Sequence, residues 1–326
     1  MSILIVGGAG YIGSHTAKLV AAAGQKPIVF DNLVYGHRWA VNWGPLIEGD
    51  LADGALIDRA IQEHGVTAVI HFAAYTYVGE SVSNPGKYFR NNVANTMNLL
   101  DAMVRNRVRD IVFSSTCAIY GDPIAVPISE DHPQNPVNPY GESKRMVERM
   151  LHWYQGAHGL RYAALRYFNA SGADPDDAIG EDHDPETHLI PLAIMAAQGR
   201  RAALDIFGTD YPTPDGTAIR DYIHVLDLAD AHLRALERLV AGTPSLHLNL
   251  GTGTGHSVRQ VIAAVEKAMG QRVPVREVGR RAGDPPALVA DARAAAATLG
   301  WTPRRPDIDT IVQHAVAWHR RATPKS

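Results

Sequence analysis

Residues 1–15 read MSILIVGGAGYIGSH, a short apolar run followed by glycines at positions 7, 10 and 13. The run predicts a β-strand, and the residues from Tyr11 onward predict a helix. In such a unit Gly7 permits the tight turn, Gly10 lets the backbone approach a pyrophosphate, and Gly13 lets the helix pack on its strand. The helix N-terminus would then offer free N–H groups to phosphate. The alternative is an ordinary strand-to-helix turn.

A carboxylate follows at the distance expected for a dinucleotide site. The second predicted strand, PIVF at 27–30, ends at Asp31, where a carboxylate would bind a ribose hydroxyl. Asp31 also favours NAD, because it would repel the extra phosphate of NADP; its alternative role is a helix cap. Asp50 follows a third strand and could hold the adenine amino group or cap the next helix. Strand, turn, helix and acid together favour the cofactor interpretation.

The rest of the first half alternates β-branched runs with helical patterns. Strands are expected in TAVIHF at 67–72, RDIVFSS at 109–115 and YAALRYF at 162–168, with helices at about 88–105 and 139–156. This alternation predicts an α/β fold with a Rossmann-type doubly wound parallel sheet. After about residue 170 the pattern loosens. We therefore expect an NAD-binding domain at 1–170 and a smaller α/β substrate-binding lobe at 171–326, with the chain free to cross back later.

Composition excludes several classes of protein. The chain has 326 residues, 46% of them apolar and 20% charged, and its formal net charge is −3. We therefore expect no nucleic-acid partner, and no run approaches the ~18 apolar residues of a membrane span. The N-terminus also lacks the charged region of a signal peptide. Cys117 is the single cysteine, which excludes an internal disulfide and favours the cytoplasm. A nucleophilic role for it is disfavoured by its place just after an apolar strand.

Hydroxyl side chains and one lysine form the candidate catalytic set. Tyr140 and Lys144 are an i, i+4 pair on one helical face, and Pro139 suits the first helical position. Ser114 and Thr116 lie at the carboxyl end of a predicted strand, where ligands of parallel sheets bind. Lowering a tyrosine pKa from ~10 to ~7 requires roughly 4 kcal/mol, more than the ~1 kcal/mol of an exposed ion pair. The pair therefore requires burial, the helix dipole and an oxidised nicotinamide to act as a base.

At these residues the chain resembles the extended short-chain dehydrogenases/reductases and, more narrowly, the UDP-glucose (UDP-galactose) 4-epimerase family. The similarity runs nearly end to end and is most specific at 207–232. The segments that carry it are GGAGYIGSHT, DNL, EGD, VIHFAA, VGESV, FSST, YGESK, LRYFNASGA, FGTDYPTPDGTAIRDYIHVLDLADAH, NLGTG and AGDPPAL.

The resemblance implies reversible 4-epimerisation of UDP-glucose and UDP-galactose on tightly bound NAD. Tyr140 would remove the proton of the sugar 4-hydroxyl, Lys144 would lower the Tyr140 pKa and bind the nicotinamide ribose, and Thr116 would bond the 4-oxygen. The hydride would pass from C4 to NAD and return to the other face after the keto sugar rotates. A homodimer is also implied, through the helices at about 88–105 and 139–156.

The resemblance further assigns binding residues. The NAD set is Gly7, Gly10, Tyr11, Ile12, Gly13, Asp31, Asn32, Asp50, Leu51, Phe72, Ala73, Ala74, Asn91, Ser114, Tyr140, Lys144 and Phe168. The UDP-sugar set is Thr116, Tyr140, Asn169, His188, Leu189, Arg220, Arg281 and Asp284. The two arginines suit a diphosphate because guanidinium forks match its oxygens. Without the surrounding motif, a surface charge would be the simpler interpretation of each.

Three positions depart from the family pattern. Thr76 stands where many members carry a lysine near the cofactor, so one cationic contact is lost. Leu288 stands where some members use a tyrosine to limit sugar size, which leaves N-acetylated sugars and pentoses open as substrates. His188 replaces an asparagine that touches substrate in some members.

The polar segment EDHDPETH, 181–188, raises the question of a metal. No second ligand cluster with fixed spacing is visible, so we expect a polar loop over the substrate site and no metal. Two rival functions share the fold. A nucleotide-sugar 4,6-dehydratase would follow its threonine with Asp and Glu, whereas Cys117 and Ala118 follow Thr116 here. A non-catalytic NAD sensor would not need Thr116, Tyr140 and Lys144 together.

Overall fold

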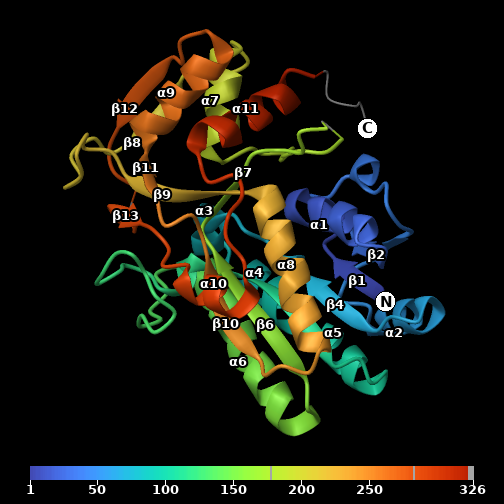
Figure 1. The fold of residues 1–326 in the computed structure, drawn as a ribbon. Helices are drawn as coiled ribbons and strands as arrows, with labels where there is room; N and C mark the ends of the chain where they lie inside the picture. Colours follow the sequence, from blue (N-terminus) through green and yellow to red (C-terminus); the bar gives the residue numbers. More distant parts are fainter. Residues whose placement is uncertain (177, 282, 322–326) are drawn as a thin grey trace.

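A seven-stranded parallel sheet forms the centre of the molecule (Figure 1), seen in a computed structural model that describes residues 1–176, 178–281 and 283–321. Its strand order is β10-β6-β5-β4-β1-β2-β3. The strands are β1 (Ser2–Val6), β2 (Lys26–Asp31), β3 (Leu46–Glu48), β4 (Ala68–His71), β5 (Asp110–Thr116), β6 (Arg161–Tyr167) and β10 (Leu246–Leu250). The order reverses between β1 and β4, which is the switch point where such sheets bind ligands.

Helices cover both faces of this sheet, and β1 shows why. Ile3 and Ile5 point into one apolar cluster, while Leu4 and Val6 point into another, because successive side chains of a strand alternate. Both clusters are buried, so the strand is apolar throughout. The first cluster packs under α1 (Tyr11–Ala22), α8 (Val225–Val240) and α10 (Arg293–Leu299), and the second under α2 (Gly54–His64), α5 (Asn95–Arg105) and α6 (Pro139–His158).

The long helix predicted at about 88–105 is a composite. It begins as α4 (Pro85–Tyr88), continues as a π-helical stretch, η2 (Phe89–Ala94), and ends as α5. The wide turn carries Asn92, whose side chain bonds both the N–H and the C=O of Tyr75, at 2.8 and 3.0 Å, and also Ser143. The π-helical stretch thereby ties the loop after β4 to α6.

The C-terminal half builds a smaller α/β unit. A four-stranded sheet holds β11 (Gly255–Ser257), β9 (Ile219–His224), β13 (Ala287–Leu288) and β7 (Asn169–Ser171), and a two-stranded sheet pairs β8 (Leu204–Phe207) with β12 (Val275–Val278). The helices α7 (Leu189–Ala197), α9 (Val258–Met269) and α11 (Ile308–His319) share one core with these sheets. The remaining short elements are α3 (Val78–Ser83), η1 (Arg38–Ala40) and η3 (Cys117–Ile119).

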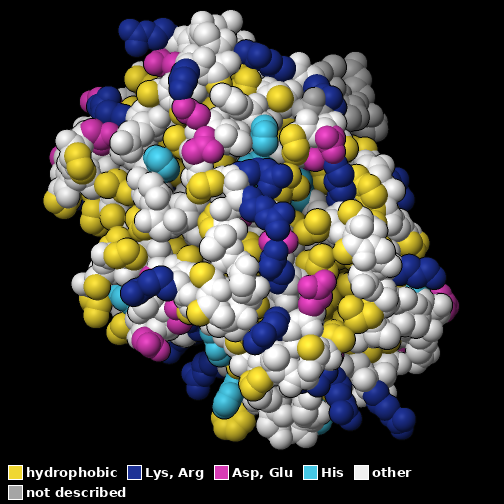
Figure 2. All heavy atoms as spheres, viewed as in Figure 1, with side chains coloured by type: hydrophobic (Ala, Val, Ile, Leu, Met, Phe, Trp, Pro, Cys, Tyr) yellow, Lys and Arg dark blue, Asp and Glu magenta, His cyan; other side chains and the backbone are white. Residues whose placement is uncertain are grey.

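The chain does cross back, because β10 pairs with β6 in the large sheet. The predicted Rossmann-type α/β architecture is confirmed, whereas the division at residue 170 stays a prediction. Charged side chains of both signs are interspersed with apolar ones on the face shown in Figure 2. Among the described residues, no helix is both long and apolar enough to cross a membrane.

Candidate active site

In the turn between β1 and α1, packing within the protein requires glycine at positions 7 and 13 but not at position 10. Gly7 has φ +79°, and a Cβ there would lie 2.5 Å from the Ala73 nitrogen. A Cβ at Gly13 would lie 2.2 Å from the Gly7 oxygen. A Cβ at Gly10 would meet only the Gly7 oxygen, at 3.4 Å, and its φ is −82°. The folded chain therefore does not itself require glycine at position 10, which fits close approach of a pyrophosphate.

The first turn of α1 has unsatisfied donors. The first N–H groups of any α-helix have no intrahelical partner, and the N-cap here, Gly10, has no side chain to accept from them. Tyr11 in this turn donates its hydroxyl to the Gly172 oxygen at 2.6 Å and so links the turn to the segment after β7. Ile12 packs against the core instead. The N-terminus of α1 thus has the donors and the partial charge that a diphosphate requires.

Asp31 ends β2 beside this turn and is only 8% exposed. Its carboxylate accepts hydrogen bonds from the Ala9 N–H at 3.0 Å and the Leu33 N–H at 2.9 Å. Burial raises the Asp31 pKa, although both backbone donors act to lower it. The same contacts hold the carboxylate at the edge of the sheet, next to Gly36, where a ribose hydroxyl would be bound.

Asp50 is not the cap that we considered for the next helix. Asp53 caps α2, accepting from the Leu56 N–H at 3.0 Å. Asp50 instead accepts from the side chain of Asn32 at 2.7 Å and from Asn95 at 3.2 Å. These contacts place the predicted pair Asn32 and Asp50 together at the carboxyl ends of β2 and β3.

The other predicted NAD residues follow neighbouring strands of the same sheet. Phe72, Ala73 and Ala74 follow β4, Ser114 lies in β5 and Phe168 follows β6. Because the carboxyl ends of parallel strands share one edge, these residues lie along one side of the sheet. Leu51 is buried beyond β3, and Asn91 lies in the π-helical stretch, where it donates to Asn92.

Tyr140 meets the end of β5 because α6 starts unusually close to it. Asn138 caps α6, accepting from the Gly141 N–H at 2.9 Å, and Pro139 occupies the first turn. A Cβ at Gly141 would lie 2.5 Å from the Ala118 oxygen, so only glycine permits this approach. Thr116, two residues before Ala118, is the last residue of β5 and is 7% exposed.

Burial dominates the titration of both Tyr140 and Lys144. It raises the pKa of Tyr140 to about 12, although a hydrogen bond with Thr116 acts to lower it. It lowers the pKa of Lys144 to about 7, although Glu148 acts to raise it. Lys144 is 2% exposed, and its ammonium donates to the Ser114 oxygen at 2.8 Å. An ammonium buried in this way is suited to ribose hydroxyls as further partners.

A buried ion pair behind Lys144 was missed from the sequence. Glu148 accepts from Arg166 at 3.0 and 2.6 Å and from Ser115 at 2.5 Å, and both ionic side chains are at most 4% exposed. Glu148 repeats the i, i+4 spacing from Lys144 along α6, a signal that could have revealed it. The pair supports α6 against β5 and β6.

The predicted substrate residues lie mainly on the smaller unit. Asn169 begins β7, and Leu189 begins α7. Arg220 on β9 donates to the Pro285 oxygen at 2.9 Å and lies 3.5 Å from the Asp284 carboxylate. The guanidinium of Arg281 stacks over the Phe207 ring, 4.1 Å from its centroid. Stacking on an aromatic ring and pairing with a carboxylate fix the orientation of a guanidinium group, whose fork of donors matches bidentate anions.

The structure also places two of the positions that depart from the family pattern, Leu288 and Thr76, and the single cysteine. Leu288 pairs with Arg220 in register and packs on a cluster that includes Cys117 and Phe168. Thr76 is exposed in the loop after β4. Burial raises the pKa of the Cys117 thiol to about 12, which keeps it protonated and unreactive at neutral pH.

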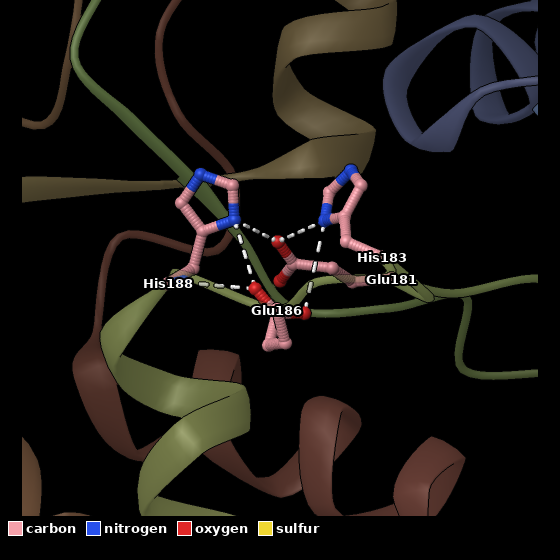
Figure 3. A group of neighbouring side chains, drawn as sticks. All are labelled: Glu181, His183, Glu186 and His188. Atoms are coloured by element: carbon pink, nitrogen blue, oxygen red, sulfur yellow. Dashed lines mark hydrogen bonds and ion pairs between the residues drawn. The ribbon is translucent and has the colours of Figure 1, made fainter. Parts of the chain in front are cut away.

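His188 does not stand alone. Figure 3 shows its imidazole and that of His183 turned toward the carboxylates of Glu181 and Glu186. Burial lowers the pKa of His188, but the two carboxylates outweigh it and raise that pKa to about 10. They raise the pKa of His183 to about 9 in the same way.

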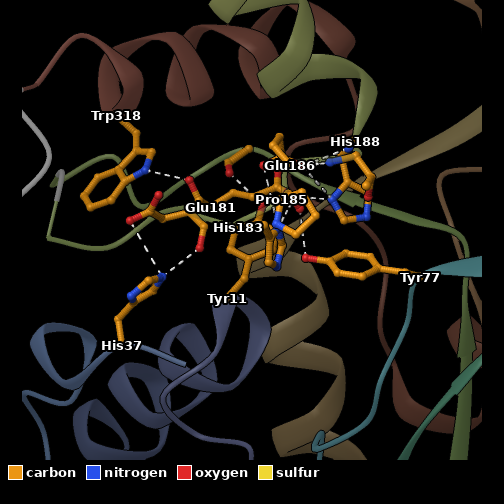
Figure 4. A network of polar contacts seen from close by, with 12 residues as sticks. Tyr11, His37, Tyr77, Glu181, His183, Pro185, Glu186, His188 and Trp318 are labelled. Atoms are coloured by element: carbon orange, nitrogen blue, oxygen red, sulfur yellow. Dashed lines mark hydrogen bonds and ion pairs between the residues drawn. The ribbon is translucent and has the colours of Figure 1, made fainter. Parts of the chain in front are cut away.

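The loop that carries this group is held from several sides (Figure 4). Tyr77 donates its hydroxyl to the main-chain oxygen of Pro185 at 2.9 Å, and Trp318 donates its indole N–H to the main-chain oxygen of Glu181 at 2.9 Å. His37 lies 2.8 Å from the Asp182 oxygen. The segment 181–188 is therefore fixed between the Rossmann unit and α11.

The sequence matches the model of the NAD dependent epimerase/dehydratase family over residues 3–251. This chain belongs to that family. A UDP-glucose 4-epimerase of Rhizobium leguminosarum bv. trifolii is 51% identical over 321 residues, spanning 98% of each chain. The crystal structure of UDP-glucose 4-epimerase from Brucella ovis in complex with NAD is 54% identical, covers 97% of each chain and has a TM-score of 0.95. The corresponding protein of Bifidobacterium longum, solved with NAD+ and UDP, is 36% identical, covers 98% of each chain and has a TM-score of 0.93.

Family membership confirms the resemblance drawn from the sequence. It makes the chain an NAD-dependent epimerase, and the site fits that cofactor on its own terms. No contact within the protein requires glycine at position 10, so this position is open to a pyrophosphate. The first turn of α1 has N–H groups without a side-chain cap, and the Lys144 amine is buried.

Proposed function

We propose that the chain interconverts UDP-glucose and UDP-galactose by transient oxidation at C4 of the sugar. One observation carries this proposal: Tyr140, in the first turn of α6, lies beside Thr116 at the end of β5 and one turn from the buried Lys144. The three side chains share the sheet edge that carries the glycine turn.

Side chains of this protein would remove and return the proton of the sugar 4-hydroxyl. The Tyr140 phenolate takes the proton of the 4-hydroxyl and later returns it, while Thr116 bonds the 4-oxygen and orients the phenol. Lys144 stabilises the phenolate by its charge and binds the nicotinamide ribose. When bound, NAD accepts the C4 hydride and gives it back. No proton or electron is lost over the cycle, so no external oxidant is consumed.

We propose that the 171–326 lobe holds the nucleotide. Arg220 and Arg281 would bind the diphosphate, Asp284 the uridine ribose, and Asn169 and Leu189 the sugar and its linkage. Support comes from the partly buried Arg220 and from the stacked guanidinium of Arg281. His188 would add its outward-facing ring nitrogen to this surface.

An isotope experiment tests the reaction. UDP-galactose deuterated at C4 is incubated with purified protein without added NAD, and the UDP-glucose formed is examined by mass spectrometry and NMR. We expect the label to remain at C4, because the hydride returns to the carbon it left. Loss of deuterium to water, or a 6-deoxy product, would remove the epimerase proposal.

We also propose a cytoplasmic homodimer. Met97 on α5 and Met146 and Trp153 on α6 expose 45%, 38% and 69% of their surfaces, and helix faces of this kind are typical of contact between subunits. Sedimentation equilibrium should give twice the mass of one chain, and Trp153→Arg should shift it toward monomer. A monomeric wild-type protein at micromolar concentration would contradict the dimer.

A further inference from the structure

Four side chains outside the proposed catalytic set converge on one point. They are Glu181, His183, Glu186 and His188, and one ligand atom from each lies within 4.8 Å of all the others (Figure 3). We propose that these four residues bind one divalent transition-metal ion, with Zn²⁺ the ion that best fits the donors. The proposal shares His188 with the substrate surface proposed above, but its test by metal binding does not depend on the epimerase reaction.

The distances between the donors suit a single small ion. The His183 Nδ1 lies 3.3 Å from Glu181 Oε1 and 3.7 Å from Glu186 Oε2. The His188 Nδ1 lies 2.7 Å from Glu181 Oε1 and 3.3 Å from Glu186 Oε1. Ligands at about 2.0–2.1 Å from a tetrahedral Zn²⁺ are separated by roughly 3.3–3.4 Å. The histidine–carboxylate separations lie on both sides of that value, and the four ligand atoms as a set lie within 4.8 Å of one another, so side-chain rotations must draw the donors together to close the site.

Hydrogen bonds alone leave the group unsatisfied. Glu181 Oε1 and His183 Nδ1 are both buried and make no well-aligned hydrogen bond; they form an ion pair 3.3 Å long, and Glu181 Oε1 also lies 2.7 Å from His188 Nδ1. The Glu181 side chain is only 5% exposed, so water does not compensate. The His183 Nδ1 faces two carboxylates, one on each side, rather than a single oxygen (Figure 3). A metal ion placed between the four residues would accept one lone pair from each carboxylate and from each imidazole nitrogen, so that every buried polar atom of the group has a partner.

The donor types select the class of metal. Two imidazole nitrogens and two carboxylate oxygens suit Zn²⁺ and its neighbours Co²⁺ and Ni²⁺, whereas Mg²⁺ and Ca²⁺ prefer oxygen ligands alone. A divalent ion would displace the protons that the raised pKa values of His183 and His188 hold on these rings, and the two carboxylates would balance its charge. The site, in which only the His188 ring is exposed, would therefore carry no net charge.

Outer contacts already orient the ligands. Glu186 Oε1 accepts from the backbone N–H groups of Thr187 and His188, at 2.7 and 2.8 Å. The His183 ring meets the Tyr11 ring edge to face, with centroids 6.2 Å apart. Such second-shell contacts fix ligand orientation and raise metal affinity.

The position of this loop beside the glycine turn suggests what a bound metal would do. Tyr11 belongs to the glycine turn, so an ion held by this loop would lock residues 181–188 against the Rossmann unit. With Nδ1 of His188 bound to metal, its proton must reside on Nε2, which points away from the cluster (Figure 3). The metal would thereby fix one N–H donor at the surface that we propose for the substrate.

The test uses tag-free, NAD-loaded protein, stripped of metal with a chelator and titrated with Co²⁺ at pH 8. Four-coordinate Co²⁺ absorbs visible light more strongly than six-coordinate Co²⁺. We expect a saturable visible spectrum at about one ion per chain, removed by Zn²⁺. X-ray absorption of the zinc form should show nitrogen and oxygen ligands at about 2.0–2.1 Å, with imidazole scattering. Absence of saturable binding by the wild-type chain would overturn the proposal.

Variants locate the ion. Glu181→Gln and His183→Gln should each weaken Co²⁺ binding by more than about 100-fold, since outer-shell contacts alone contribute about 10- to 100-fold. Asp184→Asn, an exposed carboxylate of the same loop, and His158→Gln, an exposed histidine at the end of α6, are the matched controls and should bind as wild type. Near-ultraviolet circular dichroism checks that each variant is folded. Folded ligand variants that bind Co²⁺ as the controls do would overturn the assignment.

Discussion

Lys144 should destabilise the NAD-free chain at neutral pH, and replacing it should therefore stabilise the fold. Its ammonium is 2% exposed and donates to a backbone oxygen, at 2.8 Å, rather than to a carboxylate. Burial lowers its pKa from 10.5 to about 7. The unfolded chain thus binds more protons than the folded chain between these two values, so stability contributed by this site rises with pH. Lys144→Met keeps the length of the side chain and removes the charge.

The size of the change in unfolding free energy follows from the lowered pKa of Lys144. A lysine whose pKa falls by about 3.5 units costs about 4 kcal/mol at pH 7 but less than about 1 kcal/mol at pH 10. Losing the hydrogen bond to the Ser114 oxygen costs about 1 kcal/mol at either pH. We therefore expect Lys144→Met to raise the free energy of unfolding by about 3 kcal/mol at pH 7 and by about zero at pH 10.

The assay is urea unfolding of NAD-free protein, followed by circular dichroism at both pH values. Lys26→Met, at the exposed start of β2, is the control and should change the unfolding free energy by less than about 0.5 kcal/mol at each pH. A Lys144→Met protein that is less stable than wild type at pH 7, or whose difference from wild type is the same at pH 7 and pH 10, would refute the reasoning. The variant should also lose epimerase activity, a trade of function for stability.

Three further outcomes are expected. Tyr140→Phe should lower UDP-galactose turnover by about 10²- to 10⁴-fold while the NAD released per chain on denaturation stays unchanged; near-normal turnover would dismiss Tyr140 as the base. Leu288→Tyr should lower kcat/KM for UDP-GlcNAc relative to UDP-glucose by about 10-fold, because a larger ring narrows the sugar site; an unchanged ratio argues against this position as a size limit. Glu148→Gln should lower the free energy of unfolding in urea by about 3–5 kcal/mol, because it leaves the buried Arg166 charge without its partner. Glu142→Gln, a surface position of the same helix, should cost less than about 1 kcal/mol, and equal losses for the two variants would contradict the buried-pair argument.

The fold was readable from the sequence because its signals are local. The glycine turn, the apolar strand at 3–6 and the position of Asp31 each depend on a few neighbouring residues, and the structure has them in one βαβ unit. The helix at 258–269 also begins at a local signal, since Ser257 and Gln260, three residues apart, form a capping box. Local rules of turn and cap chemistry apply before tertiary contacts are known.

Contacts between distant segments were not readable in this way. The spacing within 181–188 gave no reason to expect two histidines and two glutamates to meet, because a loop has no fixed period. Their convergence depends on Tyr77, His37 and Trp318, which lie far away in sequence. The π-helical stretch at 89–94 was likewise hidden within a helical pattern, since the contact that accompanies it joins Asn92 to Tyr75, 17 residues earlier.

The titration of Tyr140 shows what the protein alone cannot do. Its pKa of about 12 must fall by roughly five units, or about 7 kcal/mol, for a base at neutral pH. One adjacent positive charge supplies about one to three units, and Lys144, with a pKa of about 7, is only about half charged there. Forming the phenolate would in turn raise the Lys144 pKa, so the two groups titrate as a coupled pair. The remaining units require a second positive charge, which the oxidised nicotinamide carries and the reduced form lacks. Proton removal by Tyr140 is therefore tied to the state of the cofactor in which hydride can leave the sugar.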